Sequence, residues 1–191
     1  MEKEEKYLDR KDLRLKDFDY SSAGAYFITI CTKNRGNFFW KIVNNEMILN
    51  EVGEIAENVW QEIPRNFNNV ELGEFIVMPN HIHGNLVIKE NVGASIYGAQ
   101  SLKKDAINRA PAKGGFAGKN NPMGKKSLGE IIRWHKGRCS FEIRKNQRDW
   151  FSWQRNYYEH IIRDNKSWQK IQDYIIFNPK NWEKDENFMV L

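Results

Sequence analysis

Two histidines, His81 and His83, are the residues whose type and spacing most directly indicate chemistry. They flank Ile82 inside residues 74–88, a stretch rich in apolar and β-branched side chains. Successive side chains of a strand point to opposite faces, so a strand here would place both imidazoles on one face, with Cβ atoms roughly 6.5–7 Å apart. That separation lets both rings reach one metal ion at about 2.0–2.1 Å. The alternative is a pair of ordinary polar side chains on the open face of a sheet.

A tyrosine and an asparagine near the C-terminus form a second candidate group. Residues 166–177 are expected to form a helix that ends before Pro179. Its expected buried stripe consists of Trp168, Ile171 and Ile175. Tyr174 and Asn178 lie one turn apart at the edge of this stripe, facing whatever the helix packs against. A tyrosine at such an edge is most often a half-buried packing residue, and the helix pattern alone does not make it catalytic.

Basic residues are concentrated in one part of the chain. Residues 101–148 carry a net charge of +10, whereas the remainder sums to −5. Such a distribution is typical of a face that binds a polyanion. Within it, Ser127 caps an expected helix and Glu130 completes a capping box. The candidate phosphate contacts on that helix are Arg133, Lys136, Arg138, Arg144 and Lys145.

The remaining periodicity predicts the elements that position these groups. Strands are expected at residues 24–32, 40–43, 46–49 and 75–88, the last with a kink at Pro79 and Asn80, and a helix is expected to begin at Asn50. This order is typical of an α+β domain with an antiparallel sheet. Residues 1–22 are expected to form a mobile arm and residues 91–126 a disordered, glycine-rich insertion. Residues 23–90 and 127–185 would then form one domain.

Composition indicates the class of partner and compartment. The chain has 191 residues, a net charge of +5, seven Trp, seven Tyr and eleven Phe. Basic charge combined with many aromatic side chains suits single-stranded nucleic acid. No stretch approaches the ~20 apolar residues of a membrane span, and the charged start lacks the apolar core of a signal peptide. With only two cysteines, which lack metal or redox spacing, we expect a cytoplasmic protein without a membrane partner.

Three motifs, taken in order, resemble one protein family. They are residues 77–83 (VMPNHIH), 153–163 (WQRNYYEHIIR) and 173–179 (DYIIFNP). With them the chain resembles the single-tyrosine transposases of the HUH endonuclease superfamily, in particular the REP-associated and insertion-sequence tyrosine transposases. The resemblance implies a ferredoxin-like α+β fold, an antiparallel sheet with helices on one face. It also implies that the histidine pair lies on a central strand and the catalytic tyrosine on a C-terminal helix.

The resemblance further implies a mechanism and a set of site residues. His81, His83 and Asn178 would hold Mg²⁺ or Mn²⁺ against the scissile phosphate of single-stranded DNA with hairpin ends. Tyr174 would attack the phosphorus, leaving a 5′-phosphotyrosine link and a free 3′-OH, and the reverse reaction would rejoin strands. Arg155, in the second motif, joins the expected DNA contacts. Family members act as monomers or homodimers, so the resemblance leaves the oligomeric state open.

Alternatives remain for individual residues and for the function. Tyr157 and Tyr158 are expected to serve packing and DNA contact rather than attack. His160 is assigned a structural or DNA-contacting role, the alternative being a third metal ligand. A histidine-triad nucleotide hydrolase also uses a His-x-His strand, but it needs a further histidine at the position of Asn85. A catalytically inactive protein that binds hairpin DNA is the second alternative.

Overall fold

The computed structural model describes residues 15, 18–90, 127–145 and 147–188. Most of the expected arm and the whole expected insertion over residues 91–126 lie outside the described residues. The elements are β1 (Gly24–Cys31), η1 (Lys33–Arg35), β2 (Trp40–Val43), β3 (Glu46–Leu49), α1 (Glu51–Gln61), α2 (Ile63–Asn66), β4 (Val70–Met78), β5 (His81–Ile88), α4 (Leu128–Lys145), β6 (Tyr158–Ile162), α5 (Asn165–Ile176) and η2 (Pro179–Lys184). None of the described helices combines the length and apolar character that crossing a bilayer requires.

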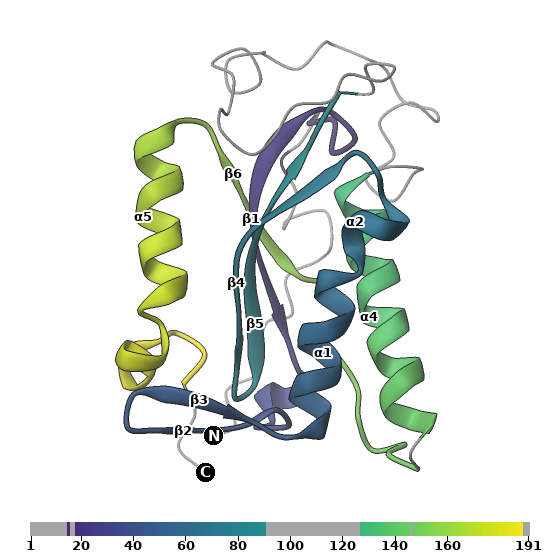
Figure 1. The fold of residues 1–191 in the computed structure, drawn as a ribbon, viewed down its shortest axis with the longest axis vertical. Helices are drawn as coiled ribbons and strands as arrows, with labels where there is room; N and C mark the ends of the chain where they lie inside the picture. The colour runs from purple at the N-terminus through teal and green to yellow at the C-terminus, as the bar shows by residue number, and fades with distance from the viewer. Residues whose placement is uncertain (1–14, 16–17, 91–126, 146, 189–191) are drawn as a thin grey trace, which may run out of the picture.

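The main sheet has four antiparallel strands in the order β4-β5-β1-β6, and Figure 1 shows it between the helices. β5, which carries the histidine pair, is therefore an inner strand. β2 and β3 form a separate hairpin that turns at Asn44 and Asn45, both with the positive φ that a tight reversal requires. The expected α+β fold with an antiparallel sheet is confirmed.

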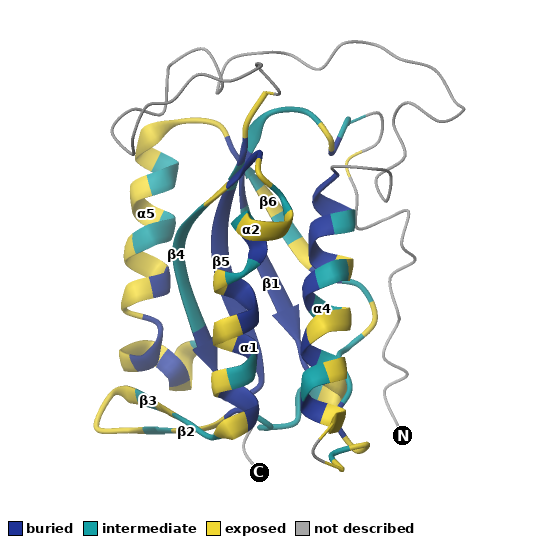
Figure 2. Cartoon of the chain, turned by 45° about the vertical axis from the view of Figure 1, so that its right-hand side comes forward, coloured by how far each residue is buried: buried dark blue, intermediate teal, exposed yellow. Residues whose placement is uncertain are grey.

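Helices cover both faces of the sheet. α1 and α4 pack together on one face, and α5 lies on the other. Tyr26, Ile28 and Ile30 of β1 point toward α1 and α4 and, with Trp60 and Leu86, are fully buried. Figure 2 shows β1 as buried along most of its length. This core fixes the orientation of β1 and β5, and their alternate side chains must point toward α5.

Gly84 allows α1 to approach β5 closely. A Cβ atom at this position would lie 2.4 Å from Trp60 Cζ2, well inside contact distance. The Trp60 ring instead lies over the strand and stacks on Phe75, with centroids 4.7 Å apart. Because residues 81, 83 and 85 alternate with Gly84, the packing of Trp60 on one face directs the histidines to the other.

Two local expectations differ from the structure. Pro79 and Asn80 do not kink one long strand; they form the two-residue reversal between β4 and β5, where Met78 pairs with His81. The apolar content of residues 74–88 gave no sign of this reversal, because both strands are largely buried. On α5 only Ile175 of the expected stripe is fully buried, since this helix lies at the edge of the sheet.

Candidate functional site

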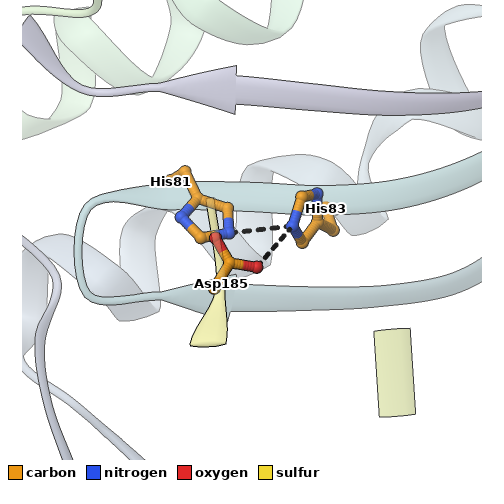
Figure 3. A group of neighbouring side chains, drawn as sticks. All are labelled: His81, His83 and Asp185. Carbon is orange, nitrogen blue, oxygen red and sulfur yellow. Dashed lines mark hydrogen bonds and ion pairs between the residues drawn. The ribbon is translucent and has the colours of Figure 1, made fainter. Parts of the chain in front are cut away.

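His81 and His83 stand at the start of β5, with both side chains on the α5 face. Their Nε2 atoms lie 2.9 Å apart, and both residues are almost completely buried. Figure 3 shows the two imidazole rings facing a common point together with Asp185. The strand periodicity that places residues i and i+2 on one face therefore brings both ring nitrogens to one position.

Neighbouring polar groups fix the orientation of both rings. The Asn80 amide nitrogen donates to the carbonyls of Arg35 and Asn187, so its Oδ1 is left to accept a hydrogen bond from His81 Nδ1 at 2.9 Å. Thr29 Oγ1 lies 2.9 Å from His83 Nδ1. A histidine held through Nδ1 presents Nε2 as its ligand atom, which is the arrangement found at metal sites.

Burial keeps the histidine pair in the form that binds metals. Removal from water lowers the pKa of His81 well below its ordinary value, and the neighbouring His83 lowers it further. Burial also lowers the pKa of His83, although its hydrogen bond with Asp185 acts in the opposite direction. Both imidazoles are therefore neutral at neutral pH, with lone pairs available to a cation.

Tyr174 reaches the histidine pair from α5. Asp164 caps this helix by accepting a hydrogen bond from the Ser167 N–H at 2.7 Å. Near the other end of the helix, Tyr174 Oη lies 3.2 Å from His83 Nε2 and donates to Asp185 Oδ2 at 2.8 Å. Burial and the hydrogen bond to Asp185 raise the pKa of Tyr174 above its ordinary value. The phenol is neutral at neutral pH, and 44 % of the residue's surface is exposed.

Asp185 is a site residue that the sequence analysis missed. It follows η2, and its ligand oxygen lies within 4.8 Å of the ligand nitrogens of His81 and His83. Burial acts to raise its pKa, but hydrogen bonds from His83, Asn178 and the Asn187 N–H outweigh burial and hold the pKa far below the usual range. The carboxylate is therefore ionised and adds a negative charge to two neutral imidazoles.

Asn178, the expected oxygen ligand, lies next to this carboxylate. Its amide nitrogen donates to Asp185 Oδ2 at 2.9 Å, and its Oδ1 atom is buried without a hydrogen-bond partner. An orphaned buried oxygen is costly unless something satisfies it. Two imidazole nitrogens, one carboxylate and one unsatisfied amide oxygen form a donor set that suits a divalent cation such as Mg²⁺ or Mn²⁺.

The expected DNA-binding residues of α4 are not brought together with this cluster, because α4 lies on the opposite face of the sheet. Several also have other partners. Lys136 Nζ donates to the carbonyls of Gln154 and Asn156, and an Arg144 guanidinium nitrogen donates to the carbonyl of Phe151. Arg138 and Lys145 pair with Glu142, whereas Arg133 and Arg155 are exposed. Lys136 thus stabilises the segment after α4.

The competing aromatic residues have different surroundings. Tyr157 is buried, and Tyr158 and His160 are exposed on β6. In the sheet register Tyr158 lies opposite Thr29, and His160 lies opposite Phe27. β1 therefore separates both residues from the histidine pair on β5. His160 is not part of the cluster formed by His81, His83 and Asp185.

Comparisons with known proteins agree with this architecture. No protein-family model matches the chain. An uncharacterised protein of Haemophilus influenzae is 39% identical over 94% of this chain and 93% of its own length. A second protein of that organism, named "Putative REP-associated tyrosine transposase", is 24% identical over 84% of this chain and 73% of its own length.

A solved structure has the same fold. It is a REP-associated tyrosine transposase bound to a REP hairpin, and it is 16% identical, with a TM-score of 0.54 over 88% of this chain and 72% of that one. The four-stranded sheet with its flanking helices is thus the fold of the tyrosine transposases. The chain forms one family with the 39% identical Haemophilus protein, and it belongs to the REP-associated tyrosine transposases.

Proposed function

We propose that the protein cleaves and rejoins single-stranded DNA at hairpins, with Tyr174 as the nucleophile and a divalent metal held by His81, His83 and Asp185. The observation that supports this most strongly is the position of Tyr174 Oη, 3.2 Å from His83 Nε2 and 2.8 Å from Asp185 Oδ2. A nucleophile and a set of metal ligands that meet at one point suit attack on a phosphodiester. The transposase related in fold was solved with a REP hairpin, which supports hairpin DNA as the partner.

The proposed reaction conserves the bond that it breaks. Tyr174 Oη loses its proton and attacks phosphorus, the bond to the 3′ oxygen breaks, and that oxygen takes a proton to become a free 3′-OH. The DNA 5′ phosphate is then held as an ester of tyrosine. A 3′-OH from another strand attacks this ester in the reverse sense, which joins two DNA ends and releases the phenol.

Each residue of the cluster has a distinct part in this proposal. Mg²⁺ or Mn²⁺ bound to His81, His83 and Asp185 would stabilise negative charge on the phosphate oxygens. Asn80 and Thr29 orient the two imidazoles. Asp185 Oδ2 holds the Tyr174 hydroxyl toward the ligand nitrogens, and α5 fixes the direction from which the phenol approaches.

A nicking and strand-transfer assay tests the proposal. The protein is incubated with labelled hairpin oligonucleotides in Mn²⁺ or in EDTA, and the products are separated on a denaturing gel. We expect cleavage and transfer in Mn²⁺ and neither in EDTA. Hairpin binding without cleavage in any divalent metal would instead support the inactive DNA-binding protein.

A further inference from the structure

The sheet face that carries the histidine pair is only partly covered by helix in the described part of the chain. α5 packs mainly against β4 and β5. Beyond them on the same face lie β1 and then the edge strand β6. Thr29 lies between His83 and Tyr158 in the register, and Phe27 pairs with His160. Directly paired residues share a face, so Phe27, Tyr158 and His160 are on the same side as the candidate site.

These three side chains form a row that starts at the candidate site. The Phe27 ring lies 5.2 Å from the His83 ring and 6.0 Å from the Tyr174 ring. Phe27 is half-buried, Tyr158 is 41 % exposed, and His160 is exposed. Two strand spacings of about 4.8 Å place the Tyr158 backbone about 10 Å from that of His83. The row therefore runs from the nucleophile to the open edge of the sheet.

The chemistry of this face suits unpaired nucleotides. β1 and β6 contribute no acidic side chain to it, and Glu159 of β6 points to the opposite face, where it accepts a hydrogen bond from Tyr20. Arg155 and Arg163 are exposed on either side of β6. Flat aromatic rings flanked by cations bind single strands, because the bases stack on the rings and the phosphates pair with the cations. Bases inside a duplex stem have no free faces to offer.

We propose that Phe27, Tyr158 and His160 form a stacking surface for the unpaired nucleotides next to the scissile phosphate. This inference rests on the proposed function, which positions that phosphate at Tyr174. The stacking surface would hold the single strand in line with the nucleophile, while the stem of the hairpin binds elsewhere. Its contribution to affinity comes from stacking rather than from charge.

Two stem-loop oligonucleotides isolate this contribution. One carries an unpaired oligothymidylate flank and the other has a blunt end, and the ratio of their dissociation constants gives the effect of the flank. Binding is measured with Tyr174→Phe protein, which forms no covalent product. Tyr158→Leu should reduce the effect of the flank by roughly 5- to 150-fold, the range of a single stacked base. The salt dependence should not change, since stacking releases no counterions.

Matched variants distinguish stacking from other roles. Tyr158→Phe keeps the ring and should retain the effect of the flank. Phe141→Leu changes another exposed aromatic residue, on α4 across the sheet, and should also retain it. The proposal is overturned if the flank adds no affinity to the parent protein, if Tyr158→Leu leaves the ratio unchanged, or if Tyr158→Phe is as weak as Tyr158→Leu. A change in oligomeric mass with Tyr158→Leu would assign the face to protein contact and would also overturn it.

Failure of this inference is distinguishable from failure of the proposed function. A covalent adduct on Tyr174 together with an unchanged flank ratio would overturn the stacking surface alone. A Tyr158-dependent flank effect without any adduct or cleavage would overturn the proposed function, and the surface would then serve a protein that only binds single strands.

Discussion

Replacing Asp185 with Asn removes the only negative charge of the candidate metal cluster while keeping the size of the side chain. The carboxylate oxygen lies 3.8 Å from His83 Nε2 and accepts a hydrogen bond from Tyr174. Changes to groups that merely support a metal ligand typically weaken binding 10- to 100-fold. Loss of the anionic ligand itself should weaken Mn²⁺ binding by about 100-fold or more, which corresponds to about 2.8 kcal/mol.

Calorimetric titration with Mn²⁺, in the absence of DNA, measures this effect directly. Asp173→Asn makes the same change one residue from Tyr174, at an exposed carboxylate that accepts a hydrogen bond from Gln169, and should bind Mn²⁺ like the parent. Asn178→Ala should weaken binding less than Asp185→Asn, because water can replace a neutral oxygen ligand. An Mn²⁺ affinity of Asp185→Asn within about threefold of the parent's would refute the ligand role of Asp185. A larger effect of Asn178→Ala would favour Asn178 as the main oxygen ligand.

Further predictions concern the site, the basic helix and the core. His81→Ala should abolish cleavage but leave hairpin binding largely intact in a gel-shift assay; normal cleavage in Mn²⁺ would contradict its ligand role. Lys136→Met should lower the urea midpoint, because each hydrogen bond from a charged group contributes about 1.5–3 kcal/mol and this ammonium makes two to backbone carbonyls. Arg133→Gln with Arg138→Gln should instead flatten the salt dependence of single-strand binding by about 0.7 log units for each phosphate that is no longer neutralised, and an unchanged slope would mean that this face only meets water. Burial lowers the pKa of His135 to about 4, so stability is fully present above its unfolded value near 6.5 and falls as pH approaches 4, by on the order of 3 kcal/mol. In urea titrations from pH 7.5 to 4.5, His135→Leu should lose that part of the pH dependence, and a pH profile like that of the parent would contradict the assignment.

The elements around the site followed from local patterns. Alternation and β-branching predicted β1 and β5, and the i, i+2 spacing of His81 and His83 fixed their common face. Helical periodicity placed Tyr174 at the edge of a stripe, and it meets the histidines because α5 crosses that face. Each of these features depends on neighbours within a few residues, which is the range over which a sequence pattern carries information.

Asp185 and Lys136 could not be assigned in this way. After Pro179 the chain has no period, and Glu183, Asp185 and Glu186 are equivalent by composition. Only the return of the chain toward β5, where Asn187 contacts Asn80, selects Asp185. The sequence likewise shows the charge of Lys136 but not the loop carbonyls that its ammonium binds, since that loop is positioned by tertiary packing.

The identity of the nucleophile is the most direct test of the proposed function. A phenol has an ordinary pKa near 10 and attacks poorly unless its surroundings assist it, and Tyr174 is placed beside the histidine pair and Asp185. Incubation with a labelled hairpin oligonucleotide in Mn²⁺, followed by a denaturing gel, shows the covalent adduct as a slower band. We predict that Tyr174→Phe folds, binds DNA and forms no such band, while the exposed control Tyr158→Phe still forms it. A band that persists in Tyr174→Phe, or that disappears only in Tyr158→Phe, would contradict Tyr174 as the nucleophile.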